Sequence, residues 1–264
     1  MKEWLLAGLA LLPASPAAAA AGVESICADR PGNATPTCTV PSGILQVETG
    51  LADWIRDRSG GIRSASLTVG DTAVKIGVTD RLHIEMDFTP FTRADERTGG
   101  NRRRASGLGD AGVALKYRMT ADDAPVQFAV RPFVKLPVAK RSLGNGKVEG
   151  GAEFSLDSTF AGSSAGWNLD SEVDVVSDAD GSGYHFAMAQ AASAGLPLSD
   201  RFTVSAELWT SSDFDPDRTV RQYSIDAAAA YLVSSDVQLD AGVDLGLNRD
   251  TPDLEIYSGI AIRF

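Results

Sequence analysis

Apolar and polar residues alternate along most of the chain after residue 44. The clearest case is the stretch from Val237 to Leu247, in which every odd position is apolar and every even position is polar or glycine. Because successive side chains of a β-strand point to opposite faces, this pattern predicts a strand with one apolar and one polar face. The stretches 81–92, 125–136 and 201–212 repeat the pattern. No amphipathic helical pattern of useful length competes with it.

Turns rich in Gly, Asp, Ser and Asn divide this region into alternating stretches, most of them about 10 to 15 residues long. The division predicts about twelve strands, an even number as in bacterial single-chain barrels. We therefore expect an all-β fold, a closed antiparallel transmembrane β-barrel with short periplasmic turns. The predicted strands are 44–55, 64–78, 81–92, 107–119, 125–136, 147–160, 166–176, 183–196, 201–212, 220–233, 236–247 and 253–264.

A soluble β-sandwich would also show alternation, but two features favour a barrel in a membrane. Strands of about 11 residues or more fit a tilted crossing of the ~25 Å apolar band, whereas strands are usually about 5 to 6 residues long. The polar face is also rich in charge, which a barrel in lipid must turn inward. The side chains expected to line the lumen are His83, Glu85, Asp87, Lys116, Arg118, Arg131, Lys135, Glu153, Asp170, Glu172, Asp174, Glu207, Asp226, Asp240 and Asp244.

The lengths of the connections predict the orientation of the barrel. If the mature chain starts in the periplasm, the two longest connections, 93–106 and 137–146, both lie on the outer side. Longer outer loops and short periplasmic turns are the expected asymmetry, and both mature termini are then periplasmic. The other outer loops, 177–182, 213–219 and 248–252, are modest, so we expect a low outer profile.

The last predicted strand carries Ile256, Ile260, Ile262 and Phe264 on one face, and the chain ends there. A terminal aromatic residue in phase with an amphipathic strand resembles the C-terminal signal by which outer-membrane barrels are recognised for insertion. We therefore expect the barrel-assembly machinery to recognise Phe264.

The N-terminus has the features of a secretory signal peptide. Lys2 precedes an apolar stretch from Trp4 to Leu12, and the small residues from Ala17 to Ala21 offer cleavage sites. An uncleaved anchor is the alternative, but the apolar stretch is far shorter than the ~20 residues that a spanning helix needs. The expected organisation is a signal peptide, 1–21, a periplasmic segment, 22–43, and a barrel, 44–264.

The two cysteines, Cys27 and Cys38, both lie just after the predicted signal peptide. In an oxidising compartment this spacing favours a disulfide that closes a small loop in the periplasmic segment. Lipidation of Cys27 is one alternative, although the preceding Glu24, Ser25 and Ile26 make a poor lipidation sequence. A metal site is a weaker alternative because no histidine lies nearby. We expect no metal and no cofactor.

The net charge of −11 and the pI of about 4.6 argue against nucleic-acid binding. Arg102, Arg103 and Arg104, in the longest predicted loop, either pair with lipopolysaccharide phosphates or form a solvated basic patch. The predicted outer loops are rich in acidic residues. These residues could serve as oxygen ligands of Ca²⁺, but we favour the interpretation that they form a solvated acidic rim at the mouth of the barrel. These acidic residues are Asp178, Asp180, Asp213, Asp215, Asp217, Asp250 and Asp253.

Several short sequence motifs lie in a characteristic order along nearly the whole mature chain. Among them are 40–50, 77–82, 106–110, 198–201 and the terminal Arg263-Phe264. In this ordered set the chain resembles a family of outer-membrane barrels named for an association with the meta pathway of phenol degradation and often labelled transporters. One departure is Val138-Ala139, where the family tends to have Thr-Gly, and it affects a loop rather than the fold. The resemblance implies a barrel with a transport role and no known substrate.

Three functions are compatible with these features. The first is an outer-membrane transporter or channel for small solutes, aromatic or hydrophobic ones included, with an acidic lumen. The second is a non-conducting structural or binding barrel with a filled interior, which segment 22–43 would help to plug. The third is a membrane-embedded hydrolase, but neither His83 nor His185 belongs to a recognisable catalytic motif, so we expect no enzyme. The expected partners are outer-membrane lipid, lipopolysaccharide, the barrel-assembly machinery and a small solute.

Overall fold

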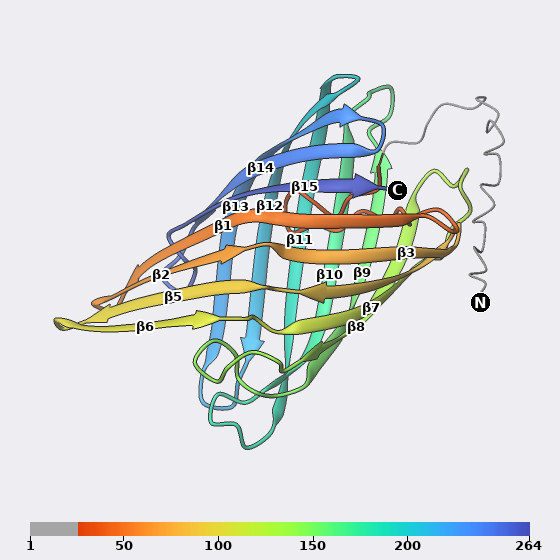
Figure 1. The fold of residues 1–264 in the computed structure, drawn as a ribbon. Helices are drawn as coiled ribbons and strands as arrows, with labels where there is room; N and C mark the ends of the chain where they lie inside the picture. Colours follow the sequence, from red (N-terminus) through yellow and green to blue (C-terminus); the bar gives the residue numbers. More distant parts are fainter. Residues whose placement is uncertain (1–25) are drawn as a thin grey trace, which may run out of the picture.

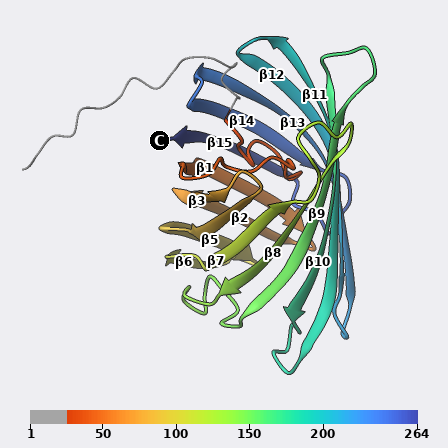
Figure 2. The same ribbon diagram turned by 90° about the vertical axis from the view of Figure 1, so that its right-hand side faces the viewer.

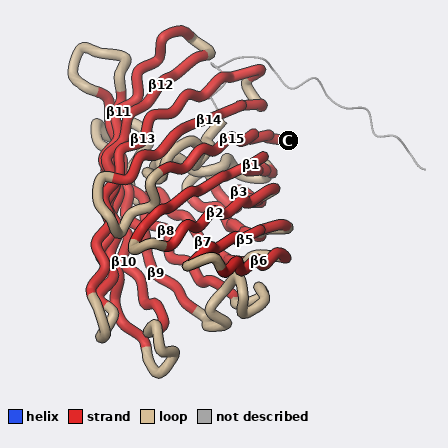
Figure 3. Tube along the Cα trace, turned by 90° about the vertical axis from the view of Figure 1, so that its left-hand side faces the viewer, coloured by secondary structure: helices blue, strands red, loops and turns tan. Residues whose placement is uncertain are grey.

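The computed structural model describes residues 26–264. The predicted signal peptide, 1–21, and the start of the predicted periplasmic segment, 22–25, lie outside the described residues. The described residues form strands, turns and loops (Figure 3). None of them forms a helix long and apolar enough to cross a membrane.

Fifteen antiparallel strand segments form one continuous sheet (Figure 1). They are β1 (Leu45–Ser59), β2 (Ile62–Val69), β3 (Asp71–Thr79), β4 (Leu82–Phe88), β5 (Phe91–Thr98), β6 (Asn101–Gly107), β7 (Ala111–Arg118), β8 (Gln127–Leu136), β9 (Glu149–Thr159), β10 (Gly166–Ser177), β11 (Tyr184–Ser199), β12 (Phe202–Phe214), β13 (Thr219–Ser234), β14 (Val237–Gly246) and β15 (Leu254–Arg263).

The sheet closes on itself because β1 pairs with β15 as well as with β2 and β3. The fifteen segments make twelve strands, since β2 continues into β3, β4 into β5 and β6 into β7 across short breaks. β1 and β2 on one wall cross β11 to β13 on the other at a steep angle (Figure 1), as expected of strands tilted against a barrel axis. The predicted closed antiparallel barrel of twelve strands is confirmed.

Polar side chains point into the barrel and apolar ones point out. On β4, for example, His83 and Glu85 are buried, whereas Ile84, Met86 and Phe88 are exposed. Buried polar and exposed large apolar side chains reverse the arrangement of a soluble protein. An apolar outer surface on a closed ring of hydrogen-bonded strands is the arrangement that a lipid bilayer requires.

Four neighbouring strands are interrupted at the same height, along a line that we call the crease. β1 has a bulge after Gly50, and the breaks in the other three strands lie at Gly70, at 89–90 and at 108–110. The Gly70 N–H donates to the Gly50 carbonyl over 2.8 Å. Gly70 has a φ of 76°, and a Cβ there would lie only 2.9 Å from the Pro90 ring, so the position requires glycine. A bulge aligned with breaks in the neighbouring strands bends a sheet. Here the bend separates the closed barrel from the parts of these strands that continue past it.

Beyond the crease, β1, β2, β5 and β6 continue as a four-stranded extension. Its two hairpins turn at 60–61 and 99–100, where all four residues are glycines with positive φ, as tight two-residue turns require. Within the described chain β6 pairs only with β5, so its other edge has no strand partner.

The expectation of a long outer loop at 93–106 is wrong. β5 and β6 pair throughout this stretch, and only the turn at 99–100 remains outside the strands. The extension also means that this side of the barrel does not have the expected low profile (Figure 1). The physical reason is that arginines replace apolar residues at alternate positions there, so the pattern that marks a membrane strand stops although the strand continues.

The connections differ between the two ends of the barrel. The short-turn end carries 80–81, 119–126, 160–165, 200–201 and 235–236, and the loop end carries 60–61, 99–100, 137–148, 178–183, 215–218 and 247–253. The chain enters β1 and leaves β15 at the short-turn end. There the Phe264 N–H donates to the Leu45 carbonyl over 2.8 Å and extends the seam that closes the barrel, while the phenyl ring is exposed.

Phe264→Ala tests whether this terminal residue acts in assembly. We expect several-fold less folded protein in the outer membrane, because the exposed ring at the closing seam is the expected insertion signal. Folded barrel is measured by its heat-modifiable migration on gels. Phe160→Ala, at an exposed phenylalanine of the same end, is the matched control and should assemble normally. Normal assembly of the Phe264 variant would refute the assignment.

Candidate functional site in the barrel lumen

Residues 26–43 fold into the barrel and fill part of its lumen. We call this segment the plug. It is drawn in orange-red in Figure 2 and lies inside the curve of the barrel wall. Ile26, Thr35, Thr37 and Val40 are buried, and most of the segment is irregular. The part of predicted segment 22–43 that the structure describes therefore enters the barrel.

A disulfide between Cys27 and Cys38 ties the plug into a compact loop. The two Cα atoms lie 5.9 Å apart, and the chain contains no free cysteine among the described residues. The predicted disulfide is confirmed. Because a disulfide reduces the conformational freedom of the open chain, it favours the compact form of the plug.

Asp29 of the plug binds two lysines of the wall. Its Oδ2 lies 2.6 Å from Lys75 Nζ on β3, and its Oδ1 lies 2.8 Å from Lys116 Nζ on β7. Both lysines are completely buried, and Lys75 also contacts Glu48 of β1. Burial by itself would raise the pKa of Asp29, but the ammonium groups of Lys116 and Lys75 outweigh it and hold the pKa well below its ordinary value.

Further wall side chains bind the backbone of the plug. Both carboxylate oxygens of Glu207 on β12 accept N–H groups, from Asn33 and from Ala34, each over 2.9 Å. His83 Nδ1 on β4 accepts the Val40 N–H over 3.1 Å, which requires the neutral imidazole to carry its proton on Nε2. Each contact satisfies a plug donor that has no secondary structure to satisfy it.

Two further acidic side chains of the wall, on β14 and β9, also hold the plug. Arg30 Nη2 pairs with Asp240 Oδ1 on β14 over 3.1 Å, and Asp157 on β9 accepts the Thr37 N–H over 2.8 Å. The plug is therefore attached around the lumen, to β3, β4, β7, β9, β12 and β14.

Glycines in the wall make room for the plug. A Cβ at Gly77 of β3 would lie 1.8 Å from the Pro41 carbonyl oxygen, and one at Gly259 of β15 would lie 2.2 Å from Arg30 Nε. A side chain at Gly77 would displace the backbone of the plug, whereas one at Gly259 would displace the Arg30 side chain. At Gly77, wall and plug are thus fitted to each other at the level of the backbone.

The lumen wall is electrically asymmetric. On one side, Arg131 of β8 lies 2.9 Å from Glu85 and 3.1 Å from Glu153, so these charges are paired. On the other side, acidic residues follow one another along β10, β13 and β14. Within the described chain no lysine or arginine lies within ion-pair distance of Glu172, Asp174, Asp226 or Asp244.

The strand register places the side chains expected to line the lumen on its inner side, but in three separate groups. His83, Lys116, Glu207 and Asp240 contact the plug. Arg118 lies at the short-turn end beside Asp122, and Lys135 lies toward the loop end, 2.6 Å from Glu149. The remaining residues, Glu85, Asp87, Arg131, Glu153, Asp170, Glu172, Asp174, Asp226 and Asp244, lie along the wall between these positions.

Sequence reasoning missed several residues that hold the plug, among them Asp29, Arg30, Glu48, Lys75 and Asp157. Glu48 and Lys75 occupy polar positions of strands that the alternation predicted, so the signal for them was present. Asp29 and Arg30 lie in an irregular segment without periodicity, where only the tertiary structure shows what they contact.

His185 lies in an acidic cluster toward the loop end. Its Nδ1 lies 2.8 Å from Asp178 and its Nε2 lies 2.6 Å from Asp213, while Asp215 lies 3.8 Å from Nδ1. Asp178, His185 and Asp215 present ligand atoms within 4.8 Å of one another, close enough to hold a metal ion. Both ring nitrogens of His185 contact carboxylates, and a protonated imidazolium paired with these carboxylates would give the same geometry without a metal ion.

The chain matches the family described as "Putative MetA-pathway of phenol degradation" over residues 28–264. The chain belongs to this family. The resemblance noted in the sequence is thereby confirmed. Among curated proteins, nothing matches the sequence significantly.

Solved outer-membrane barrels have a similar fold. A crystal structure of an outer membrane channel from Pseudomonas putida F1 has a TM-score of 0.70 at 14% identity, with 89% of this chain and 99% of that chain covered. The β domain of the Bordetella autotransporter BrkA has a TM-score of 0.53 at 13% identity, covering 84% of this chain and 100% of its own. At such identities the similarity shows the fold alone, that of an outer-membrane β-barrel.

Asp29→Asn should loosen the plug. The variant leaves Lys75 and Lys116 buried without their shared counter-ion, so we expect the free energy of plug opening to fall by about 2–4 kcal/mol. Hydrogen exchange at the amides of Asn33 and Val40, which the wall protects, measures this opening. Asp122→Asn removes an exposed carboxylate that pairs with Arg118 of the wall rather than with the plug, and it should change the opening free energy by less than about 0.5 kcal/mol. Equal exchange in the Asp29 variant and wild type would contradict the assignment.

The contribution of Asp29 should also depend on pH. Because the pKa of Asp29 is lowered in the folded protein, its stabilisation is fully present above the ordinary pKa of about 4 and is lost as the pH falls toward the lowered value. The difference in opening free energy between wild type and Asp29→Asn should therefore be the same at pH 7 and pH 6 but smaller at pH 3. A difference that grows on acidification would have the wrong sign.

Proposed function

We propose that the protein is an outer-membrane channel for small solutes whose path is controlled by the plug. The observation that carries the proposal is the way in which the plug is held. Ion pairs and hydrogen bonds, centred on Asp29 between Lys75 and Lys116, join it to the wall. Water can replace such contacts at lower cost than it can enter a packed apolar core, so the plug is suited to reversible release.

The loop end faces outward in this proposal, and both mature termini lie in the periplasm. Supporting this, the chain enters β1 and leaves β15 at the short-turn end, and short turns are typical of the periplasmic side of such barrels. The exposed Phe264 then also lies where the barrel-assembly machinery would meet it.

The lumen favours cations over anions in this proposal. Glu172, Asp174, Asp226 and Asp244 line one wall without a basic partner in ion-pair distance among the described residues. Acidic groups along a narrow aqueous path attract cations and repel anions. Among neutral solutes, aromatic compounds are the class that matches the description of the family.

A non-conducting barrel is the second candidate, and the density of plug contacts favours it. If Asp29, Arg30 and the backbone of 33–40 never leave the wall, the barrel is a binding or structural protein. We do not propose an enzyme, since His83 bonds the plug backbone and His185 lies between Asp178 and Asp213.

Single-channel recording in planar bilayers separates the two candidates. The full mature chain should conduct briefly and rarely, whereas Glu207→Gln, which weakens the hold on Asn33 and Ala34, should open several-fold more often. Reduction of the Cys27–Cys38 disulfide should act in the same direction. Asp200→Asn, in a turn of the short-turn end, is the control and should behave as wild type.

Ion selectivity tests the role of the acidic wall. In a salt gradient the reversal potential of wild type should indicate cation preference, and the double variant Glu172→Gln, Asp174→Asn should shift it toward zero. Absence of current from wild type, Glu207→Gln and reduced protein alike would overturn the channel proposal in favour of the filled barrel.

A further inference from the structure

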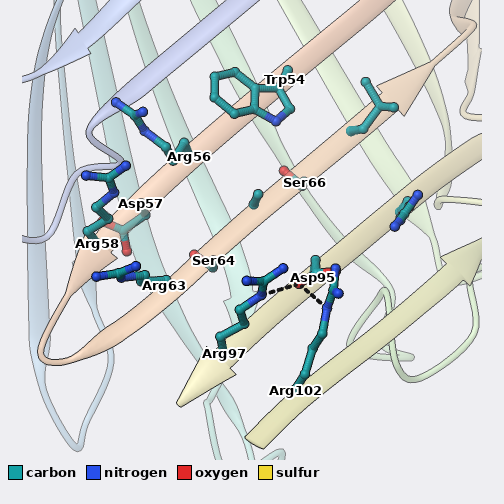
Figure 4. Close-up of a pocket in the computed structure, with 13 residues that line it drawn as sticks. Trp54, Arg56, Asp57, Arg58, Arg63, Ser64, Ser66, Asp95, Arg97 and Arg102 are labelled. Atoms are coloured by element: carbon teal, nitrogen blue, oxygen red, sulfur yellow. Dashed lines mark hydrogen bonds and ion pairs between the residues drawn. The ribbon is translucent and has the colours of Figure 1, made fainter. Parts of the chain in front are cut away.

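Arginines cover one outer face of the extension beyond the crease. The register places Trp54 opposite Leu67 on the outer side of the wall, whereas the neighbouring Asp53 faces inward opposite Tyr257. By the same alternation Arg56 and Arg58 point outward. Figure 4 shows these side chains and those of the neighbouring strands from outside the barrel.

Four of the arginines form an unbroken row across four strands. Arg58 of β1 pairs in register with Arg63 of β2, Arg63 with Arg97 of β5, and Arg97 with Arg102 of β6. Neighbouring strands are about 4.8 Å apart, so the row is about 14 Å long. We call it the arginine row.

The next positions toward the barrel continue the positive charge. There the register runs from Arg56 through Ala65 and Asp95 to Arg104. At the next outward position toward the barrel, Arg93 of β5 lies between Leu67 of β2 and Ser106 of β6. Asp95 is the single acidic side chain among these outward positions, and it contacts Arg97, Arg102 and Arg104.

The arginine row is unfavourable unless something anionic covers it. Like charges directly opposite each other on paired strands are destabilising, and the row contains three such pairs in succession. Asp95 neutralises only one of the charges. On the inner side of the same hairpins, by contrast, Arg103 lies opposite Glu96, so strand pairing there joins opposite charges. The outer face thus has a surplus of positive charge that the described residues 26–264 do not balance.

The arginines begin where the apolar outer surface ends. On β1 the outward side chains from Leu45 to Trp54 are mostly apolar, and Arg56 follows. On β5 the outward Phe91 is followed by Arg93. Ten strand residues tilted by about 40° span roughly 25 Å, which is the height of the apolar band of such barrels. The arginines therefore lie at the level of lipid headgroups.

A groove joins the two regions. It has a volume of about 390 Å³, and its lining combines Trp54, Ala65 and Leu67 with Arg56, Arg93 and Arg97 (Figure 4). Arg56 stacks 5.8 Å from the centre of the Trp54 ring. An apolar floor that leads up to guanidinium groups fits an amphiphile with an acyl chain below and phosphate above.

We propose that this face binds the phosphorylated glycolipid of the outer leaflet, lipopolysaccharide, through its phosphate groups. Guanidinium forks bind phosphate oxygens in pairs, and a row about 14 Å long suits a headgroup with several phosphates better than a phospholipid with one. The assignment of the lipid rests on the proposed orientation, in which the loop end faces outward. Bound phosphates would supply the negative charge that Asp95 alone does not provide for the four arginines of the row.

Binding of purified lipopolysaccharide to the full mature barrel in detergent micelles tests the proposal. The double variant Arg63→Gln, Arg97→Gln removes the middle of the arginine row and should bind about tenfold more weakly or worse. Enzymatically dephosphorylated lipopolysaccharide should bind wild type as weakly as intact lipopolysaccharide binds the variant. Inorganic phosphate should compete only at far higher concentration, because it lacks the acyl chains and the second phosphate.

Arg103→Gln is the matched control, since Arg103 lies between two outward arginines in sequence but faces inward, opposite Glu96. It should bind lipopolysaccharide as wild type does, and heat-modifiable migration should show that every variant is folded. Equal binding by wild type and the double variant, or equal binding of phosphorylated and dephosphorylated lipid, would overturn the proposal. Tighter binding of phosphatidylglycerol than of lipopolysaccharide would assign the face to a phospholipid and overturn it too.

The test is independent of conduction. A barrel that carries no current but binds lipopolysaccharide through the arginine row would refute the channel while leaving this site in place. Labelling of a cysteine introduced beside the turn of the extension (Asn101→Cys) by a membrane-impermeant reagent on intact cells checks the orientation. If the introduced cysteine is labelled only after the outer membrane is permeabilised, the extension lies on the periplasmic side. The arginine row could then not reach the lipopolysaccharide of the outer leaflet.

Discussion

Two completely buried lysines, Lys75 and Lys116, face the interior of a barrel whose outer surface is occupied by apolar side chains. Charged groups cannot point outward into an apolar band, and a buried charge without a partner is costly. Asp29 of the plug meets both requirements at once, because its two oxygens reach lysines on β3 and β7, which are separated by β4. The lowered pKa of Asp29 follows from this interaction, which also joins the plug to two strands of the wall.

The remaining charge of the lumen is not distributed evenly around this centre. Arg131 joins Glu85 to Glu153 beside the lysines, whereas Glu172, Asp174, Asp226 and Asp244 have no lysine or arginine within ion-pair distance among the described residues. The wall therefore binds the plug around the lumen and also carries acidic groups that add negative potential. A segment held by polar contacts next to an acidic wall combines a means of closing a path with a preference for what passes along it.

The outer surface follows the same alternation, interrupted at the crease. The outward positions are mostly apolar below the crease and up to Trp54 and Leu67 just above it. Further out they carry the arginine row, Arg58, Arg63, Arg97 and Arg102. The strands continue through the change because their backbone hydrogen bonds do not depend on which side chain faces out. The extension thus makes one protein surface match two layers of a membrane, hydrocarbon below and charged headgroups above.

Alternation, together with strand length, turn positions and the charge on the polar face, predicted the closed barrel and its twelve strands, because a strand in lipid has only one polar side to use. The sequence also predicted the Cys27–Cys38 disulfide, from spacing and compartment. It could not reveal that 93–106 is a hairpin, because arginines at outward positions carry no apolar signal. Nor could it predict the contacts of Asp29 and Arg30, because an irregular segment has no periodic pattern that shows which side its residues face. Only the tertiary structure brings Asp29 to Lys75 and Lys116, residues 46 and 87 positions away along the chain, because closure of the sheet determines which distant side chains share the lumen.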